Sequence, residues 1–330
     1  MIKDLKDKIL VIFLTGFLFL AFSFQLREVK AQTLSLSLWP PVLEAMIMPG
    51  KSITQAYTIT NAGLDTVIET QILKFEPSDE HGNITLVENV QADQKCPLFS
   101  FENANLNLGI PFQLRSGNSE QVILKITIPE DCPEDDYYFT FLFSTPPSAK
   151  IGRSVSREAG TIGANLLLTV SKDGQPLRKG EIAEFTLNQC QRLPLFNFCL
   201  IDSLNPVELI LRVKNTGQAF WKPFGTIKIN GLLRQSTAIE IMPENILTKA
   251  SRQLRAQCQA GEEIYPCPLI WEPKFLFGPY RVQAELAIAS PQGNKITQNL
   301  TFLAFPFKLT IAILTGIILL FMIKAKLFQK

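Results

Sequence analysis

Two uncharged apolar stretches, one near each end of the chain, bracket all six of its cysteines. The first covers residues 9–24 and the second residues 309–323. An N-terminal stretch of this kind is typical of a signal peptide, and a C-terminal one of a stop-transfer helix. We therefore predict that the body between them matures outside the cytosol, where disulfides persist.

The first stretch is predicted to be removed. Basic residues at Lys3, Lys6 and Lys8 precede it, and Val29-Lys30-Ala31 offers small or apolar residues at the two positions that signal peptidase reads. We place cleavage after Ala31, so that residues 1–31 are the signal peptide. The alternative is an uncleaved anchor, for which 16 residues are short of the roughly 20 that a span needs.

The second stretch is predicted to be a transmembrane helix at 307–323, followed by a basic tail at 324–330. Residues 309–323 alone would reach only about 22 Å at 1.5 Å per residue, less than the ~30 Å hydrocarbon core. Residues 302–307 would complete the span if Lys308 snorkels toward the headgroups. The lysines of the tail, Lys324, Lys326 and Lys330, then stay in the cytoplasm by the positive-inside rule.

Composition excludes two classes of protein. Hydrophobic residues make up 46% and charged residues 19%, which is too apolar for a disordered chain. The overall charge is +2, but nine of the 32 Lys and Arg lie in residues 1–31 and 308–330. The body between them is left with an acidic excess, so it has no cationic field for nucleic acid.

The body reads as short strands separated by turns. In residues 122–128 the apolar Val122, Leu124, Ile126 and Ile128 alternate with Ile123, Lys125 and Thr127, and the run ends at Pro129. Trp39-Pro40-Pro41 interrupts the first strands. No long stretch has a helical period. The predicted fold is all-β: two tandem immunoglobulin-like β-sandwiches, at 32–175 and 176–306, plus the C-terminal helix.

Two sequence features occur once in each predicted sandwich. A strand ends in Asn-x-Gly at Asn61 and again at Asn215, where glycine is expected to supply a positive φ. A strand opens on Tyr137 and another on Tyr280. In such sandwiches a tyrosine at this place ties down the preceding corner. Because these two features occur in the same order in both sandwiches, we predict that the second sandwich repeats the domain type of the first.

The cysteines are predicted to be disulfide-bonded. Zinc sites usually leave two to four residues between paired ligands, whereas two of these pairs have eight residues between them. The alternative left open is a crossed pairing within the second sandwich. The predicted bridges are Cys96–Cys132, Cys190–Cys199 and Cys258–Cys267.

In such a topology, both cysteine loops of the second sandwich should face the bilayer. The first is rich in apolar residues, and we predict that it rests on the membrane or on the helix. The alternative is an internal plug of the sandwich end. The candidate membrane-contact residues are Leu193, Leu195, Phe196 and Phe198.

No constellation of catalytic residues is predicted. The single histidine, His81, lies in a turn-rich stretch that resembles an exposed hairpin tip and lacks partners for a triad. A cluster of carboxylates could hold Ca²⁺, but its spacing fits no calcium loop. We therefore predict no enzyme, no metal site and no cofactor. The clustered carboxylates are Glu130, Asp131, Glu134, Asp135 and Asp136.

Several short motifs resemble bacterial surface proteins. The runs Pro49-Gly50-Lys51-Ser52 and Thr58-Ile59-Thr60-Asn61 resemble the opening of bacterial immunoglobulin-like domains, and Ile126-Thr127-Ile128-Pro129 resembles their closing half. Together they resemble the first domain of WxL-interacting cell-surface proteins and, more loosely, that of pilus-assembly chaperones. The resemblance implies peptidoglycan binding by the first domain and protein binding by the second.

The chain also departs from these families. Glu134-Asp135 stands where a glycine is usual, and the cysteines are not a usual feature. The paired basic residues with which pilus chaperones grip a subunit are not evident. The predicted function is a non-enzymatic, membrane-anchored cell-surface interaction or adhesion protein that binds a cell-wall polymer or a protein partner. The alternative is a membrane-tethered chaperone that lends a strand to pilus-like subunits.

Overall fold

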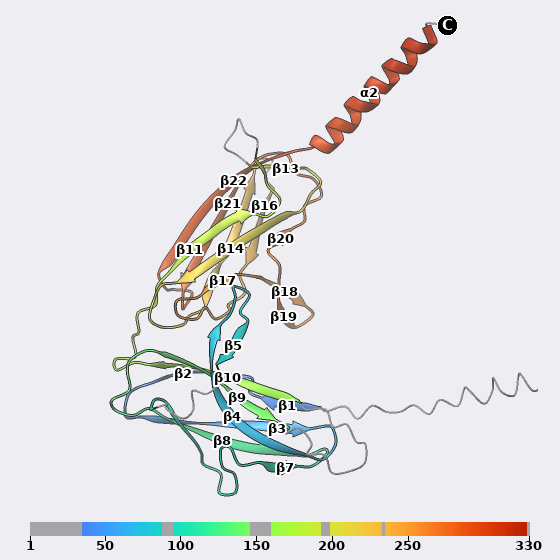
Figure 1. Cartoon of the computed structure of the whole chain (residues 1–330). Helices are drawn as coiled ribbons and strands as arrows, with labels where there is room; N and C mark the ends of the chain where they lie inside the picture. Colours follow the sequence, from blue (N-terminus) through green and yellow to red (C-terminus); the bar gives the residue numbers. More distant parts are fainter. Residues whose placement is uncertain (1–34, 88–94, 146–159, 193–198, 233–234, 329–330) are drawn as a thin grey trace, which may run out of the picture.

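The computed structural model describes residues 35–87, 95–145, 160–192, 199–232 and 235–328. Within them the predicted fold class is confirmed: two β-sandwiches follow one another, and one apolar helix, α2 (Phe307–Phe328), leaves the far end of the second (Figure 1). The predicted signal peptide and the predicted membrane-contact loop at Leu193, Leu195, Phe196 and Phe198 lie outside the described residues.

Sandwich 1 is built from two sheets that share one apolar core. The first sheet has the order β1 (Leu36–Trp39), β3 (Ser52–Asn61), β8 (Ser119–Thr127), β6 (Leu98–Phe101). The second has the order β2 (Val42–Ile47), β10 (Thr161–Val170), β9 (Asp136–Ser144), β4 (Thr66–Pro77), β5 (Ile84–Val87), with β7 (Phe112–Leu114) also paired to β4.

Alternation along the strands explains this core. Tyr57 and Ile59 of β3 and the apolar residues of β8 point inward, where they meet Phe139, Phe141 and Phe143 of β9. The rings of Tyr57 and Phe141 lie 5.3 Å apart, edge to face. The opposite face of β9 is turned away from this core, and one of its residues, Tyr138, packs toward sandwich 2 instead.

Sandwich 2 repeats the two-sheet plan around a separate core. One sheet has the order β11 (Gly180–Leu187), β14 (Val207–Asn215), β17 (Ser251–Gln253), with β20 (Ile270–Trp271) also paired to β14. The other has the order β12 (Gln191–Arg192), β13 (Cys199–Asp202), β22 (Lys295–Phe305), β21 (Gly278–Ile288), β15 (Pro223–Gly231), β16 (Ser236–Glu240). A separate hairpin joins β18 (Ala256–Ala260) to β19 (Glu263–Cys267).

The two Asn-x-Gly sequences have the same role in each sandwich. The Asn61 side chain donates to the carbonyls of Leu64 and Leu114 and accepts from the Gly63 N–H. The Asn215 side chain likewise donates to Ala219 and Ile246 and accepts from the Gly217 N–H. The expected positive φ is wrong for both glycines. At Gly217 the reason for glycine is space, since a Cβ would lie 2.5 Å from the Leu177 oxygen.

The two tyrosines also tie down their corners, as predicted. The Tyr137 hydroxyl donates to the Pro133 carbonyl at 3.0 Å, and the Tyr280 hydroxyl accepts from the Phe277 N–H at 3.3 Å. Each bond spans three or four residues and closes the turn that precedes β9 or β21.

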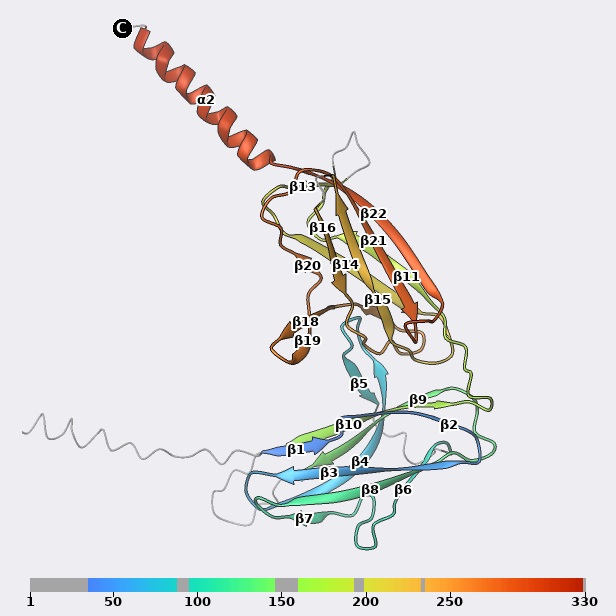
Figure 2. The ribbon, with the colours of Figure 1, turned by 180° about the vertical axis from the view of Figure 1, so that it is seen from behind.

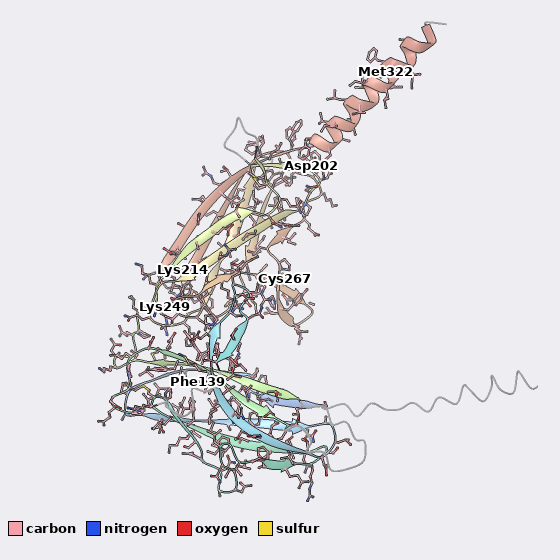
Figure 3. The ribbon with its side chains drawn as sticks, viewed as in Figure 1. Phe139, Asp202, Lys214, Lys249, Cys267 and Met322 are labelled. Carbon is pink, nitrogen blue, oxygen red and sulfur yellow. A yellow bond between two sulfur atoms is a disulfide. The ribbon has the colours of Figure 1, made fainter. Side chains whose placement is uncertain are left out.

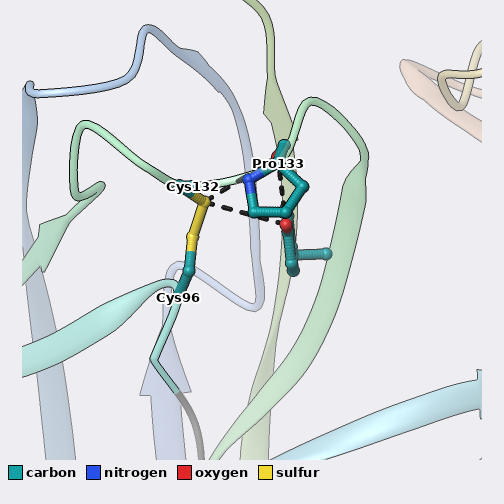
Figure 4. The surroundings of a disulfide bond; sticks show 4 residues. Cys96, Cys132 and Pro133 are labelled. Atoms are coloured by element: carbon teal, nitrogen blue, oxygen red, sulfur yellow. Dashed lines mark hydrogen bonds between the residues drawn. A yellow bond between two sulfur atoms is a disulfide. The ribbon is translucent and has the colours of Figure 1, made fainter.

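The six cysteines lie in three pairs at disulfide distance. Cα–Cα separations are 5.7 Å for Cys96–Cys132, 5.3 Å for Cys190–Cys199 and 5.8 Å for Cys258–Cys267, all within the range that a bridge needs. Figure 4 shows the first pair beside Pro133, where it ties the start of β6 to the turn before β9.

Two expectations about the membrane end are wrong. The Cys258–Cys267 hairpin, β18–β19, does not face the side from which α2 leaves, but lies toward sandwich 1 (Figures 1 and 2). It follows β17, which pairs with β14 near Lys214, at the end of β14 nearer sandwich 1. Residues 302–305 do not extend the helix, because they belong to β22 and Phe302 is only 2% exposed.

The buried asparagines give a first test. Asn61→Ala would leave the buried Leu114 carbonyl and the part-buried Leu64 carbonyl without their donor, and a buried polar group without a partner costs ~1–3 kcal/mol. We expect sandwich 1 to lose about 2–4 kcal/mol of unfolding free energy on this basis, measured by hydrogen exchange of its core strands. Asn215→Ala should do the same to sandwich 2 only. Asn118→Ala, at an exposed position, is the control, and equal effects of all three would contradict this role.

Candidate interaction site: the open edge of strand β10

Strand β10 is paired along its whole length on one side but only along half on the other. On one side it pairs with β9 from Thr161 to Thr169. On the other side it pairs in parallel with β2, but only from Asn165 to Val170. Residues 161–164 therefore pair with no described strand on the side that β2 occupies further along, and β1 of the other sheet lies close to β10. We call residues 161–164 the open edge.

The prolines before β2 explain why the pairing stops there. The chain leaves β1 in the first sheet at Trp39, passes Pro40 and Pro41, and enters β2 in the second sheet. Proline has no N–H to donate to a ladder, but the Pro41 carbonyl accepts the N–H of Asn165 at 2.9 Å. This bond is the last on that side before the open edge begins.

The open edge presents backbone groups outward. The N–H of Asn165 points toward β2, and successive residues of a strand direct these groups to opposite edges. Thr161 and Gly163 share the direction of Asn165, whereas the Gly160 carbonyl faces β9 and accepts from Thr145 at 3.0 Å. An unpaired row of N–H and C=O groups is a template for another strand.

Glycine at position 163 keeps this edge flat. A Cβ there would lie 2.7 Å from Cγ2 of Thr140 and 2.9 Å from Cδ2 of Leu142, so β9 leaves no room for a side chain. Glycine inside a strand often marks a place where another backbone approaches closely. Trp39 ends β1 two residues before Pro41, where the pairing with β10 stops, and its 72% exposed side chain offers apolar surface there.

The junction of the two sandwiches fixes the orientation of the open edge relative to sandwich 2. The Asp136 carboxylate of β9 accepts bonds from the Tyr138 and Thr169 hydroxyls, at 2.5 and 2.7 Å, within sandwich 1. It also accepts from the Phe220 N–H, at 2.5 Å, and the Thr248 hydroxyl, at 2.6 Å, in sandwich 2. Burial and the charge of Asp136 raise the pKa of Tyr138 well above its ordinary value, so its hydroxyl stays a donor.

Apolar packing surrounds these bonds. Phe75, Tyr138 and Leu167 form a small cluster on the outer face of the second sheet, and Phe220 and Leu247 of sandwich 2 pack on it. At the rim, Glu44 of β2 accepts from Lys222 at 2.9 Å and from Asn245 at 2.6 Å. A groove of about 320 Å³ lies between these contacts and the β4–β5 hairpin.

The β4–β5 hairpin makes a second connection between the sandwiches. At its tip, the Glu80 carboxylate pairs with the Arg212 guanidinium of β14, at 2.5 Å to Nε and 2.9 Å to Nη2. The Glu80 carbonyl also accepts the Gln253 N–H of β17 at 2.8 Å. Gly82 lies against Arg252, where a Cβ would come within 2.6 Å of the guanidinium carbon.

Comparisons with known proteins give a likeness of fold only. No family model matches the chain, and neither does any curated protein. Among solved structures, the class 5 fimbriae chaperone CfaA is 13% identical with a TM-score of 0.35, over 82% of this chain and 100% of that one. The E. coli chaperone DraB is 16% identical with a TM-score of 0.34, over 82% and 97%.

A chain of the Salmonella enterica SafA pilin–SafB chaperone complex is 10% identical with a TM-score of 0.33, over 83% of this chain and 98% of that one. Likeness at these levels is too weak to carry an inference about function. The resemblance to WxL-interacting proteins stays a prediction, since no family model supports it.

Two predicted features end up away from the open edge. His81 lies at a hairpin tip as expected and its side chain is exposed, but the tip contacts sandwich 2 through its neighbour Glu80. The acidic cluster is dispersed: Asp136 lies at the junction, while Glu134 accepts the Lys172 N–H at 2.9 Å. Among the described residues, no group of three His, Cys, Asp or Glu could hold a metal ion.

Sequence reasoning missed the open edge and both connections between the sandwiches. Pro40-Pro41 and Gly163 were visible signals of an interrupted ladder. The pairing of Glu80 with Arg212, 132 residues later, had no signal in the sequence. Such a contact follows from how the sandwiches are placed and not from local pattern.

The hairpin connection can be tested through the segment that joins the sandwiches. Glu80→Gln removes the charge that pairs with Arg212, an ion pair worth about 0.5–1 kcal/mol at this exposure. We expect faster trypsin cleavage at Lys172 and Lys179, which lie between β10 and β11. Glu102→Gln, which breaks the Lys125 pair inside sandwich 1, should leave cleavage unchanged. Equal rates in both variants would contradict this role of the hairpin.

Proposed function

We propose that this chain is a non-enzymatic, membrane-tethered binding protein that holds an extended strand of an exported protein partner on the open edge. The observation that carries the proposal is the half-paired β10, with outward backbone groups at Thr161 and Gly163 in line with β2. The occupant would continue the second sheet of sandwich 1 by β-strand addition. The proposal modifies the membrane-tethered chaperone predicted from the sequence, because here the partner adds a strand to this chain's sheet, whereas the predicted chaperone lends a strand to pilus-like subunits.

The energetics fit a reversible partner. Backbone hydrogen bonds contribute about 0.5–1.5 kcal/mol each, so those of two outward residues alone give weak binding. Apolar side chains of the partner must add to them, and the exposed Trp39 beside the edge supplies a surface for this. Affinity would then come from the backbone and selectivity from the side chains.

The anchor in this proposal is α2. Phe307–Lys324 is long and apolar enough to cross a membrane, with a mean hydropathy of 2.1 and none of it buried. With Lys324, Lys326 and Lys330 in the cytoplasm, both sandwiches lie outside. We keep the domain boundary between 175 and 176, inside the segment that joins β10 to β11. The adhesion and cell-wall-polymer interpretation stays a prediction that the described contacts do not favour.

Photo-crosslinking in intact cells tests this proposal. A photoreactive phenylalanine analogue in place of Thr161 should form an adduct with an exported protein, identified by mass spectrometry. The matched control is Ala238 on β16, the outermost strand of its sheet in sandwich 2. Adducts at both positions, or at neither while the chain is present in the membrane, would contradict strand addition on the open edge.

A further inference from the structure

We propose that the end of sandwich 2 beside α2 is a membrane-contact surface that sits in the lipid headgroup layer. Five large apolar side chains there are each between 41% and 68% exposed. The inference rests on the proposed anchoring by α2, and it adds a second contact with the bilayer. We call this set the apolar end: Leu204, Leu232, Phe275, Phe277 and Phe305.

Hydrogen bonds and close packing bring these residues together from four segments of the chain. The Ser203 N–H donates to the Phe305 carbonyl at 3.3 Å, and the Leu276 N–H donates to the Ser203 carbonyl at 2.9 Å. Gly278 lies against Leu232, where an added Cβ would meet its side chain at 3.7 Å. The Gln235 amide donates to the Phe275 carbonyl at 3.0 Å. The apolar end is therefore one surface.

The helix is joined to this surface without a flexible connection. β22 ends at Phe305 and α2 begins at Phe307, separated by Pro306 alone. The Lys308 N–H donates to the Asp202 carboxylate at 2.9 Å, and the Lys308 ammonium donates to the Asn205 side chain, also at 2.9 Å. Figure 3 labels Asp202 at the end of the sandwich from which the helix leaves. When α2 inserts into a bilayer, the apolar end is therefore held next to the membrane surface.

The length of the apolar part of α2 brings that surface to the bilayer. From Phe307 to Ile323 the helix rises only about 25 Å, while the hydrocarbon core is ~30 Å thick. Strand β22 cannot supply the missing length, because Phe302 is buried with its ring stacked on Tyr280 at 4.9 Å. A short span draws its flanking residues into the interface, and here those residues belong to the apolar end.

Patches of exposed apolar side chains on a soluble domain mark interaction surfaces. Leucine and phenylalanine that face lipid settle at the boundary of headgroups and acyl chains. The continuity of the patch with α2 identifies the bilayer as its occupant. A second copy of the chain is the competing occupant, and the experiment separates the two.

The experiment uses the full chain reconstituted in vesicles of phosphatidylcholine and phosphatidylglycerol, with and without lipid brominated on the upper acyl chain. Phe277→Trp places an indole in the apolar end. Ile264→Trp, on the exposed β18–β19 hairpin away from α2, is the matched control. We expect a blue-shifted emission for Phe277→Trp and a loss of intensity with bromolipid beyond that of the unmodified chain, and neither for Ile264→Trp.

Flotation of the same vesicles, after an alkaline wash, reports separately on α2. If the chain floats but bromolipid quenches neither variant beyond the unmodified chain, the apolar end is not a membrane surface, although the anchor stands. A blue shift without quenching would mean that a second copy covers it, which also overturns the inference. A chain that does not float would overturn the anchor and the inference together.

Discussion

The Asp136 carboxylate is the contact on which the arrangement of the molecule depends. It accepts hydrogen bonds from two hydroxyls of its own sandwich and from a hydroxyl and an N–H of the other. Because Asp136 begins β9, the strand that holds β10 in place, these bonds join the open edge to sandwich 2. The Glu80–Arg212 pair adds a second connection. Two separated contacts restrict rotation of one sandwich relative to the other, whereas a single contact would leave that rotation free.

These contacts connect the helix, the two sandwiches and the open edge in series. Helix α2 is tied to Asp202 and Asn205, sandwich 2 is tied to sandwich 1, and β9 carries β10. A partner strand on the open edge would therefore be held in a set orientation to the membrane. A contact of the apolar end with lipid would restrict that orientation further, because it limits how far α2 and the second sandwich can tilt together in the bilayer.

Local pattern was enough to predict the all-β class, the turns at Asn61 and Asn215, and the corners at Tyr137 and Tyr280, because alternation and turn chemistry depend on near neighbours. It failed where distant segments meet. The sequence places Phe302 in the membrane because an apolar strand runs into an apolar helix, whereas Phe302 belongs to β22, pairs with β13 and β21, and stacks its ring on Tyr280. The β18–β19 hairpin was placed at the wrong end, and the open edge was missed, because both depend on strand pairing.

Amide hydrogen exchange at single residues tests strand addition most directly. It compares the free chain with the chain bound to the partner captured through position 161. If a partner strand occupies the open edge, the Thr161 and Gly163 amides, which point away from β9, exchange much more slowly in the complex, while Ile162 and Ala164, already paired with β9, change little. A bound partner that leaves Thr161 and Gly163 exchanging as fast as in the free chain would contradict strand addition.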